Sequence, residues 1–408
     1  MDVRISPSVL RGHVEIPASK SCAHRAIICA ALADGTSVIT GVSMSKDIEA
    51  TISSMKALGA SFTVDGSTVT VTGISSPAEN AVIDCNESGS TLRFIMPVAA
   101  ALGTEAEFTG RGRLPQRPID IYKRELSQHG ISFQTNEMPY ITTGKLSGGV
   151  FSVEGNVSSQ FITGLLFALP LLDQDSEIRL TSHLESRPYV DITIDTLRRF
   201  GISIRESEDA YFISGGQHYT PHDERIEGDW SQAAFFAVAN AINSQVDIGN
   251  LNEKSVQGDK KILEIISDMC YNGSRAGFRA DCSDIPDLVP ILSVLAAYGC
   301  EESVIFNAER LRIKESDRLV TTADMLNALG GNVTVNSDGL TIRPNAHMKG
   351  GIVDGCGDHR IVMAAAIAAL GCTGDVIIKG AEAAEKSYPD FFKDYIALGG
   401  KADVIDLE

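Results

Sequence analysis

Apolar and polar residues recur along the chain with two periods, and together these periods predict an α/β protein. Stretches with apolar residues on one helical face end at a glycine, and short runs with every second residue apolar follow most of them. Residues 61–64 and 68–71, around Asp65-Gly66, are the clearest β-hairpin. A glycine is typical of a helix C-terminus because it adopts positive φ without strain. Six helices are predicted to end in this way, at Gly59, Gly130, Gly201, Gly273, Gly330 and Gly399.

The spacing of these glycines indicates an internal repeat. Successive glycines lie 71, 71, 72, 57 and 69 residues apart, and the helix before Gly273 fits the pattern least well. Each repeat also holds a second helix that is apolar on nearly every side, as is typical of a helix inside a core. These helices cover residues 23–32, 92–102, 161–172, 233–242, 288–297 and 361–370.

Six repeats of about 70 residues predict two domains of three repeats each. In each repeat we expect one buried helix, one surface helix and about four strands. In each domain we expect the sheets to face outward, against helices on the solvent side, and to enclose the apolar helices.

Composition fits an ordinary globular protein of 408 residues, of which 43% are hydrophobic and 22% charged. No apolar run reaches the roughly 18 residues of a membrane span, and the first residues lack the layout of a secretion signal. The eight cysteines are scattered without a C-x-x-C pair, which favours a reducing cytoplasm. We expect buried thiols at Cys29, Cys270, Cys300 and Cys372.

The charge distribution narrows the choice of partner. A net charge of −18 argues against nucleic acid and anionic membranes, but it allows a small anionic substrate if cations gather locally. Residues 310–318 are such a place, with four cations and two carboxylates just before a predicted helix. Two interpretations stay open for this stretch: an anion site in which Glu315 transfers a proton, or a solvated helix start with ion pairs.

The predicted N-termini of the buried helices are rich in Ser, Asp and Gly. Each such residue taken alone is more typical of a helix cap than of a ligand. Parallel helices in two facing domains would nevertheless present many free N–H groups to an anion. The segments are residues 20–21, 88–91, 158–160, 229–231, 284–287 and 358–360.

Nine short motifs occur in order along nearly the whole chain. They are residues 19–21 with Arg25, and residues 87–93, 116–119, 157–161, 186–189, 284–287, 314–318, 357–360 and 386–390. Each motif is a weak signal, but their joint occurrence is specific. Through them the chain resembles the EPSP synthase (3-phosphoshikimate 1-carboxyvinyltransferase) family of enolpyruvyl transferases.

The resemblance implies a two-domain inside-out α/β barrel of six βαβαββ units. The N-terminal domain would be residues 19–227, on the side of shikimate 3-phosphate. The C-terminal domain would be residues 1–18 plus 228–408, with the active site in the cleft between the domains. The implied reaction moves the enolpyruvyl group of phosphoenolpyruvate to the 5-hydroxyl of shikimate 3-phosphate and releases phosphate, without metal or organic cofactor. We expect a monomer.

The same resemblance implies two sets of binding residues, with arginine forks suited to carboxylates and phosphates. Ser21 and Arg25 would lie at the shikimate carboxylate and Lys314 at a ring hydroxyl or phosphate. The shikimate 3-phosphate set is Lys20, Ser21, Arg25, Ser158, Ser159, Gln160, Ser186, Tyr189, Asp287 and Lys314. The phosphoenolpyruvate set is Lys20, Gly89, Arg117, Gln160, Arg318, His359, Arg360 and Lys386.

For catalysis we expect Glu315 to shuttle the proton at C3 of the enol, Asp287 to deprotonate the 5-hydroxyl and Lys20 to steady the leaving phosphate. Asp287 could instead cap a helix, and His359 could be a core histidine. Two positions depart from the family pattern. Glu87 stands where some members have Asn, so we expect it to point away or to pair with a cation. Arg310 stands where an Asn can contact shikimate phosphate, and it remains a weak candidate.

Two rival functions are weighed against this one. The sister enzyme that acts on UDP-N-acetylglucosamine typically carries a reactive cysteine in a lid, and residues 109–117 hold none. A non-catalytic phosphosugar-binding protein would not need Lys20, Asp287 and Glu315 together. Because Gly89 leaves room beside the expected enolpyruvyl pocket, we also expect glyphosate to compete with phosphoenolpyruvate.

Overall fold

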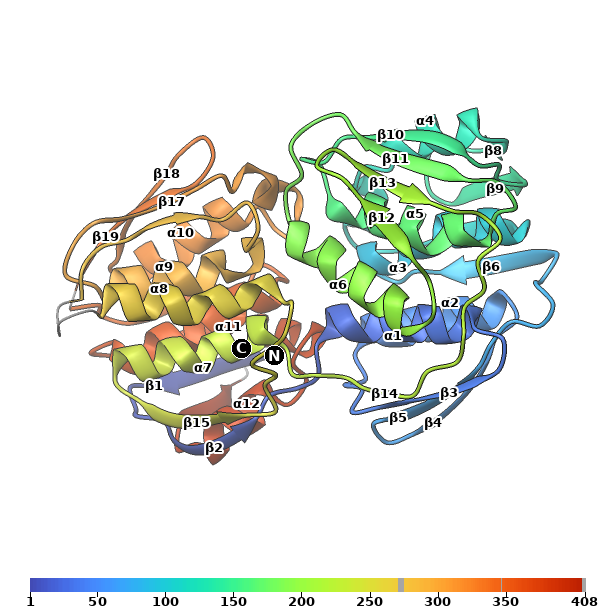
Figure 1. The fold of residues 1–408 in the computed structure, drawn as a ribbon. Coiled ribbons are helices and arrows are strands. Elements are labelled where there is room, and N and C mark those ends of the chain that lie inside the picture. The colour runs from blue at the N-terminus through green and yellow to red at the C-terminus, as the bar shows by residue number, and fades with distance from the viewer. Residues whose placement is uncertain (271–274, 346, 406–408) are drawn as a thin grey trace. The chain divides into compact units, whose positions relative to one another are not determined.

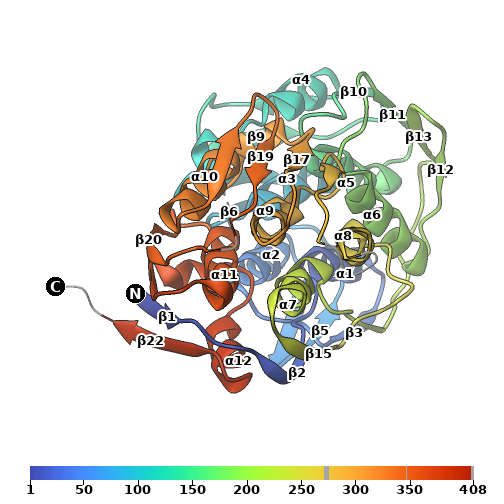
Figure 2. The same cartoon turned by 90° about the vertical axis from the view of Figure 1, so that its left-hand side faces the viewer.

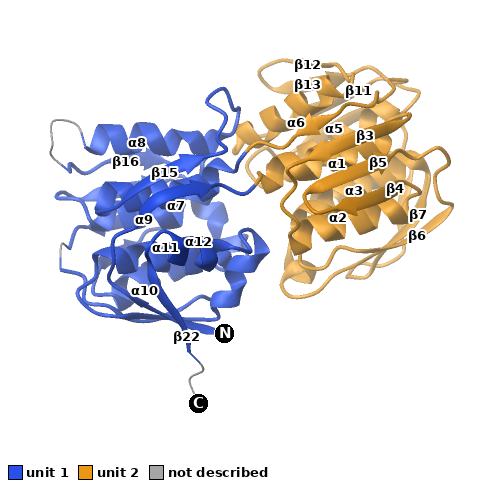
Figure 3. Ribbon diagram, turned by 90° about the horizontal axis from the view of Figure 1, so that it is seen from below, with its two compact units in different colours: residues 1–17, 228–408 blue, residues 18–227 orange. Residues whose placement is uncertain are grey.

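The computed structural model describes residues 1–270, 275–345 and 347–405. The chain folds into two compact units (Figure 3). Unit 1 comprises residues 1–17 and 228–408, and unit 2 comprises residues 18–227. This division differs from the expected boundary by one residue, Ala18, which lies in unit 2 and whose backbone N–H donates to Ser43 Oγ at 3.0 Å.

Unit 2 contains three four-stranded sheets of one design. In each sheet the first two strands are parallel and the other two are antiparallel. Parallel neighbours need a crossover, which a helix supplies in the second and third sheets, whereas the antiparallel strands form a hairpin. The first sheet has the order β14 (Glu224–Arg225), β3 (Thr36–Thr40), β5 (Thr68–Thr72), β4 (Ser61–Asp65). The second is β6 (Asn80–Asp84), β7 (Glu105–Thr109), β9 (Tyr140–Gly144), β8 (Ile131–Phe133). The third is β10 (Gly149–Val153), β11 (Ser176–Leu180), β13 (Ala210–Ile213), β12 (Ile204–Glu206).

Unit 1 repeats this design with strands from both ends of the chain. The N-terminal strand β1 lies between β21 and β22, antiparallel to both, where the other sheets place the last strand of a hairpin. One sheet is β16 (Arg279–Asp281), β17 (Ser303–Phe306), β19 (Leu340–Arg343), β18 (Asn332–Val335). The next is β20 (Gly351–Asp354), β21 (Val376–Lys379), β1 (Asp2–Ser6), β22 (Lys401–Ile405).

The remaining sheet of unit 1 corrects the expectation of four strands in every repeat. Among the described residues it holds two parallel strands, β15 (Gln245–Gly249) and β2 (Arg11–Glu15). Between α8 (Ile262–Met269) and β16, the residues that the structure describes form no hairpin of the kind that the other repeats carry. The glycine interval explains this difference, because 57 residues separate Gly273 from Gly330 where other repeats have 69 to 72. Gly273 itself lies outside the described residues.

The six apolar helices form the interiors of the units, as expected. Every residue of α9 and of α11 is buried. In unit 1 the three inner helices contact one another, and Figure 2 shows them end-on and side by side. The inner helices of unit 1 are α7 (Trp230–Ile242), α9 (Val289–Ala297) and α11 (His359–Ala368), and those of unit 2 are α1 (Lys20–Leu32), α3 (Gly89–Leu102) and α5 (Ser159–Ala168) (Figure 1).

The second helix of each repeat lies elsewhere than expected. Helix α2 contacts both α1 and α3, α6 contacts α5 and α1, and α10 contacts α9 and α11. The sheets instead expose alternate side chains: Val82 of β6 is 67% exposed and Ile352 of β20 is 55% exposed. The outer faces of these sheets therefore meet solvent, while these helices pack between inner helices. Their bounds are α2 (Lys46–Ala57), α4 (Asp120–Gln128), α6 (Arg187–Arg199), α10 (Arg318–Ala328) and α12 (Phe391–Ala397), besides α8.

Other sequence predictions have mixed outcomes. The predicted terminal glycines within the described residues all have positive φ, from +84° at Gly201 to +115° at Gly59. All eight cysteines are free; Cys29 and Cys372 are buried, but Cys270 and Cys300 are exposed, so the expectation for that pair was wrong. No described helix combines the length and the apolar character that crossing a membrane requires.

Candidate active site

The charged stretch 310–318 leads into α10 (Arg318–Ala328). Its first residues belong to a 3-10 helix, η6 (Glu309–Ile313), residues 314–316 form a bend, and Asp317 caps α10 by accepting from the Val320 N–H at 3.3 Å. Arg318 is the first helical residue and its side chain is only 2% exposed. The solvated helix start considered for this stretch therefore does not describe Arg318.

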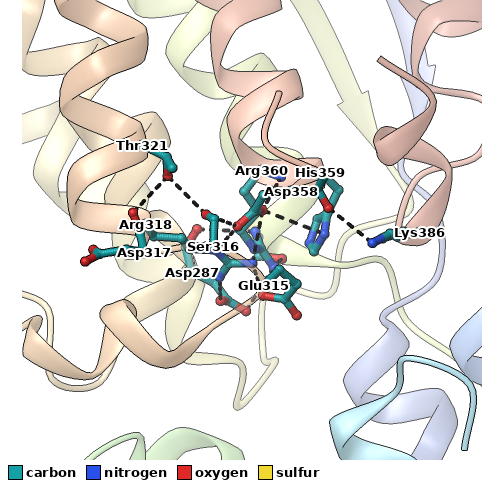
Figure 4. Close-up of polar contacts among 12 residues, drawn as sticks. Asp287, Glu315, Ser316, Asp317, Arg318, Thr321, Asp358, His359, Arg360 and Lys386 are labelled. Atoms are coloured by element: carbon teal, nitrogen blue, oxygen red, sulfur yellow. Dashed lines mark hydrogen bonds and ion pairs between the residues drawn. The ribbon is translucent and has the colours of Figure 1, made fainter. Parts of the chain in front are cut away.

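Arg318 is held by three carboxylates at once (Figure 4). Its Nε donates to Asp358 Oδ2 at 2.8 Å and its Nη1 to Asp287 Oδ1 at 2.9 Å. Its Nη2 donates to Glu315 Oε2 at 2.7 Å. Burial opposes a charge here, but Asp358, Glu315 and Asp287 raise the pKa of Arg318 above its usual value. The arginine therefore stays charged and fixes the positions of all three acids.

Asp287 lies between two arginines. Besides the bond from Arg318, its Oδ2 accepts from Arg360 Nη2 at 2.9 Å and its backbone carbonyl accepts from Arg360 Nη1 at 3.2 Å. Burial alone would raise the pKa of Asp287, but Arg360, Lys314 and Arg318 hold it well below its usual range. Asp287 belongs to a short 3-10 helix, η5 (Pro286–Leu288), and the N-cap positions of η5 and α9 are Ile285 and Leu288. Asp287 therefore does not occupy the cap position of either helix, and its carboxylate binds the two arginines.

Asp358 is the N-cap of α11 and was not singled out from the sequence. Its Oδ1 accepts from the Arg360 N–H at 3.0 Å and its Oδ2 from Ser316 Oγ at 2.9 Å. The side chain is 0% exposed, which would raise the pKa of Asp358, but Arg318 and His359 lower it overall. The sequence could have drawn attention to Asp358 as a possible helix cap within the motif 357–360. It could not show the bond to Arg318, which is 40 residues away in sequence.

Arg360 joins two inner helices. Its Nη2 donates to Ser231 Oγ of α7 at 3.0 Å as well as to Asp287. Ser231 in turn is held by Asp229, the N-cap of α7, whose Oδ1 accepts the Ser231 N–H at 2.9 Å. The N-termini of α7 and α11 therefore share one polar network, within unit 1.

Lys314 and His359 lie close to this network. Burial lowers the pKa of Lys314 to about 8, with Arg318 and Arg310 adding to the effect and Asp287 and Glu315 opposing it. His359, the first residue of α11, is buried, and its Nδ1 lies 4.0 Å from Asp358 Oδ1.

Lys386 and Arg310 lie at the edges of the same region. Lys386 Nζ donates to the backbone carbonyl of Gly357, just before α11, at 3.1 Å (Figure 4). Arg310 donates from Nη2 to the backbone carbonyl of Ser283. The segments 283–287, 310–318 and 357–360, which include three of the motifs, are thus neighbours in space although they are distant in sequence.

In unit 2, Lys20 forms an ion pair that the sequence did not indicate. Its Nζ donates to Asp47 Oδ2 at 2.8 Å, and both side chains are largely shielded, at 26% and 22% exposed. Lys20 is the first residue of α1, after the N-cap Ser19, and Asp47 lies in the first turn of α2. Because 27 residues separate the two, no helical spacing could have paired them.

Arg25 is more deeply enclosed than a substrate-facing residue was expected to be. Its side chain donates to Thr193 Oγ1 at 2.8 Å and to the backbone carbonyls of Tyr189 at 2.8 Å and Ser21 at 2.7 Å. Burial lowers the pKa of Arg25 to about 10. Arg25 therefore links α1 to α6 and fixes the backbone at Ser21 and Tyr189, both of which were predicted to bind substrate.

The serine positions are at helix starts, as the sequence suggested. Ser158 caps α5 by accepting from the Gln160 N–H at 3.3 Å, and Ser159 is the first residue of that helix. Ser186 precedes α6 with φ of +57°, an uncommon conformation for a residue other than glycine. Tyr189 lies in the first turn of α6, and its N–H donates to the Ser186 carbonyl at 3.0 Å.

Gln160 bridges two neighbours on α3. Its Oε1 accepts from Arg93 Nη1 at 2.7 Å and its Nε2 donates to Ser90 Oγ at 2.9 Å. Arg93 also donates to the Pro118 carbonyl at 3.0 Å, which attaches the segment after Arg117 to α3. The amide of Gln160 is therefore held between α3 and α5.

Gly89 and Arg117 are in direct contact. A Cβ placed on Gly89 would collide with Arg117 Nη1, so the guanidinium occupies the space that the missing side chain leaves at the start of α3. Glu87 is exposed, and its carboxyl carbon would collide with a Cβ on Gly112. Glu87 thus lies against Gly112 of the 110–117 segment.

Each unit therefore has its own group of predicted residues. The unit 1 group is Asp287, Lys314, Glu315, Arg318, His359, Arg360 and Lys386, joined by Asp358. The unit 2 group is Lys20, Ser21, Arg25, Gly89, Arg117, Ser158, Ser159, Gln160, Ser186 and Tyr189, joined by Asp47 and Arg93. Among the described residues, no group of three or more His, Cys, Asp or Glu could hold a metal ion.

Comparison with known proteins places these residues in a family context. The family model of EPSP synthase (3-phosphoshikimate 1-carboxyvinyltransferase) matches residues 5–395. A 3-phosphoshikimate 1-carboxyvinyltransferase of Clostridium novyi is 46% identical over 427 aligned positions, covering 98% of both chains. That of Clostridioides difficile is 42% identical, also over 98% of both chains. A solved EPSP synthase from Acinetobacter baumannii has a TM-score of 0.84 at 24% identity, covering 99% of this chain and 100% of that one.

Proposed function

The chain belongs to the EPSP synthase family, and we propose that the two groups of residues described above carry out that family's reaction. The protein transfers the enolpyruvyl group of phosphoenolpyruvate to the 5-hydroxyl of shikimate 3-phosphate, giving 5-enolpyruvylshikimate 3-phosphate and phosphate. This is a step of the shikimate pathway, which leads to chorismate and the aromatic amino acids.

The reaction is an addition followed by an elimination, and both steps include proton transfer. In the addition, the 5-oxygen bonds to C2 of phosphoenolpyruvate, loses its proton to a base, and C3 gains a proton to become a methyl group. In the elimination, C3 loses a proton, the C2–C3 double bond re-forms and phosphate leaves. The protein must therefore supply cations for two anionic substrates, a base for the hydroxyl and a group that protonates and deprotonates C3.

The observation that carries the assignment of roles is the single arginine, Arg318, that holds two candidate proton-transfer groups, Asp287 and Glu315, at 2.9 and 2.7 Å. We assign the proton transfer at C3 to Glu315, whose side chain is 26% exposed and so retains access to a ligand. Asp287 is the base for the 5-hydroxyl. Arg318, Arg360, His359 and Lys386 bind phosphoenolpyruvate.

Asp287 needs a further condition to act as a base. Arg318 and Arg360 hold its pKa well below the usual range, and a carboxylate so stabilised is a weak proton acceptor. The anionic groups of phosphoenolpyruvate would compete for the same guanidinium N–H groups and would place negative charge beside Asp287. Both effects raise its pKa, so binding of one substrate would prepare the base that activates the other.

Unit 2 supplies most of the groups for shikimate 3-phosphate. We assign its phosphate to Ser158, Ser159 and Ser186, where two helix N-termini offer N–H groups to an anion. We assign to the same substrate Ser21, Arg25, Gln160 and Tyr189 of unit 2 and Lys314 and Asp287 of unit 1. Arg25 donates to the backbone carbonyls of Ser21 and Tyr189. Its role is therefore to hold this backbone in place as well as to attract the carboxylate of shikimate 3-phosphate.

The unit 2 residues at the N-termini of α1 and α3 complete the phosphoenolpyruvate set. Lys20 supplies a compact positive charge for the leaving phosphate. Arg117, which contacts Gly89, supplies a guanidinium group that can bind an anionic group of phosphoenolpyruvate with two N–H groups. Residues of both units thus serve one reaction. We further propose that the protein works in the cytoplasm as a monomer without metal or cofactor.

A phosphate-release assay tests the proposed function. With phosphoenolpyruvate present, shikimate 3-phosphate should stimulate phosphate release and UDP-N-acetylglucosamine should not. Stimulation by UDP-N-acetylglucosamine would favour the sister enzyme. Binding of shikimate 3-phosphate without any phosphate release would favour a non-catalytic phosphosugar-binding protein.

A further inference from the structure

In unit 2, four buried polar side chains form a series of hydrogen bonds that links α1, α2 and α3. His24 of α1 meets Thr51 of α2, with Nδ1 and Oγ1 2.7 Å apart. Thr51 Oγ1 lies 2.8 Å from Thr91 Oγ1 of α3. Thr91 Oγ1 donates to Ser88 Oγ, the N-cap of α3, at 2.8 Å. His24, Thr51, Thr91 and Ser88 are called the hydroxyl chain below.

The hydroxyl chain is shielded from solvent along its whole length. Thr51 and Thr91 are 0% exposed, Ser88 is 1% and His24 is 2% exposed. Burial lowers the pKa of His24 to about 3, so its ring is neutral at physiological pH. Each threonine hydroxyl carries one proton, so with Thr91 donating to Ser88, Thr51 donates to Thr91 and accepts from a protonated His24 Nδ1. Because a buried polar group without a partner is costly, the four side chains favour one mutual arrangement.

The hydroxyl chain ends at the groups to which the proposed function assigns phosphoenolpyruvate. Thr91 Oγ1 also lies 3.4 Å from the backbone carbonyl of Asp47, whose carboxylate holds Lys20 Nζ at 2.8 Å. Ser88 accepts the Thr91 N–H at 3.1 Å and directly precedes Gly89. The N-terminal halves of α1, α2 and α3 are thus joined by the bonds of these side chains and of the Asp47 backbone carbonyl.

We propose that the hydroxyl chain is a positioning device that fixes Lys20 and the backbone at Gly89 relative to each other, so that both reach the same phosphoenolpyruvate. This proposal rests on the proposed function for the identity of the ligand. His24, Thr51 and Thr91 are positioning residues, since they act through Asp47, Lys20 and Ser88. A residue in the first turn of a helix is displaced when that helix slides, and a misplacement of about 1 Å can cost on the order of a hundredfold in rate.

The test uses Thr51→Val and Thr91→Val, which remove one hydroxyl and keep the shape of the side chain. We expect each to lower kcat/KM for phosphoenolpyruvate about tenfold, the scale of one buried hydrogen bond, while the affinity for shikimate 3-phosphate changes less than about threefold. Thr51→Ser and Thr91→Ser should restore most of the activity. His24→Leu should behave like the valine variants, and His24→Asn should retain activity because the asparagine amide can take the place of Nδ1.

A matched control separates positioning from stability. Thr104 is 2% exposed, and its hydroxyl donates to the Ala78 carbonyl at 2.7 Å, at the end of α3 away from Thr91. Thr104→Val should lower the melting temperature as the other valine variants do, but leave kcat/KM for phosphoenolpyruvate within twofold. Equal kinetic losses in Thr104→Val and Thr91→Val would overturn the proposal, as would unchanged kinetics in both Thr51→Val and Thr91→Val.

A second measurement does not depend on the proposed function. In the ligand-free protein, the rate at which an amine-specific acylating reagent modifies Lys20 can be followed by mass spectrometry. The Lys20–Asp47 pair should loosen when the hydroxyl chain is cut, so Thr51→Val and Thr91→Val should raise this rate and Thr104→Val should not. If the wild-type protein releases no phosphate but this pattern appears, the proposed function fails and the positioning device stands. Equal rates in all variants would reject the device itself.

Discussion

Arg360 holds Asp287 twice, with Nη2 bonded to the carboxylate at 2.9 Å and Nη1 to the backbone carbonyl at 3.2 Å. The backbone bond places the guanidinium independently of the carboxylate, so Arg360 can exchange the carboxylate for a substrate anion without leaving its place. Arg318 lacks such a backbone bond to Asp287 but is anchored by Asp358 at 2.8 Å. Each arginine therefore has an anchor that would keep it in place if its bond to the Asp287 carboxylate were replaced by a bond to a substrate anion.

The first prediction follows from this exchange. Binding of phosphoenolpyruvate near pH 5 should be accompanied by proton uptake at Asp287, since loss of its arginine partners raises a pKa that is otherwise well below 3.8. Calorimetry in two buffers of different ionisation enthalpy measures the protons exchanged. The wild-type protein should take up more protons than Asp287→Asn, and the difference removes the contribution of the ligand's own phosphate. Equal proton exchange in the two proteins would show that Asp287 does not change protonation.

The lowered pKa of Asp287 also predicts how stability depends on pH. A carboxyl group whose pKa is lower in the folded state stabilises the fold above its unfolded pKa, near 3.8, and loses that contribution as pH falls toward the folded value. The free energy of unfolding of the wild-type protein should therefore exceed that of Asp287→Asn most at neutral pH. Denaturant titrations at pH 7 and in the acid range should show the gap narrowing. A constant gap would mean that the ion pairs with Arg318 and Arg360 do not act through charge.

The lowered pKa of Lys314 predicts how kcat/KM for shikimate 3-phosphate changes at alkaline pH. Its pKa is lowered to about 8 by burial and by two neighbouring arginines, so it loses its proton as pH rises above that value. If Lys314 binds shikimate 3-phosphate as a cation, kcat/KM for this substrate should decline above about pH 8. Lys314→Arg should shift the decline to higher pH, because a guanidinium stays protonated. An identical pH profile in Lys314→Arg would assign the decline to another group.

Gly89→Ala should act through Arg117. The added methyl group would collide with Arg117 Nη1, and the guanidinium would have to move away from the start of α3. We expect KM for phosphoenolpyruvate to rise at least about tenfold, as for one lost charge-assisted bond, with KM for shikimate 3-phosphate little changed. Glyphosate should compete with phosphoenolpyruvate in the wild-type protein and should bind the variant more weakly. Inhibition that is independent of phosphoenolpyruvate concentration would contradict this account.

Lys20→Met should weaken phosphoenolpyruvate binding and turnover together. The substitution removes the charge and leaves the Asp47 carboxylate without its bond at 2.8 Å. Asp47→Asn gives a useful comparison, because it keeps Lys20 and weakens only the pair. If Lys20 acts directly on the substrate, Lys20→Met should cost more than Asp47→Asn in steady-state assays. A larger loss in Asp47→Asn would reverse the roles of the two residues.

Much of the fold follows from patterns that the sequence displays locally. Helices apolar on all sides and helices ended by glycine are each set by residues three or four positions apart, so Gly59 and Gly330 could be placed from sequence. The two-stranded sheet of β15 and β2 was missed, although the short interval after Gly273 was visible. A parallel pair between residues 11–15 and 245–249 depends on contacts that no local pattern encodes.

The candidate site divides in the same way. Helix starts such as Ser158 and Asp358 are local features, and the sequence shows them as possible caps. The bonds that position the charged side chains of the site join residues that are distant in sequence. They connect Arg318 to Asp287, Lys20 to Asp47, and Arg25 to Thr193. Arg25 illustrates the limit, because the resemblance put it with Ser21 at the shikimate carboxylate but could not show that its guanidinium is buried.

The most direct test of the account is whether Glu315 moves the proton at C3 of phosphoenolpyruvate. In deuterated water with both substrates, the wild-type protein should introduce deuterium at C3, detected by NMR in recovered phosphoenolpyruvate and in the product. Glu315→Gln should bind shikimate 3-phosphate within a few fold of the wild type, but its turnover and its deuterium incorporation should fall at least about a hundredfold. Deuterium incorporation that survives in Glu315→Gln at the wild-type rate, or that is absent from the wild-type protein during turnover, would contradict the account.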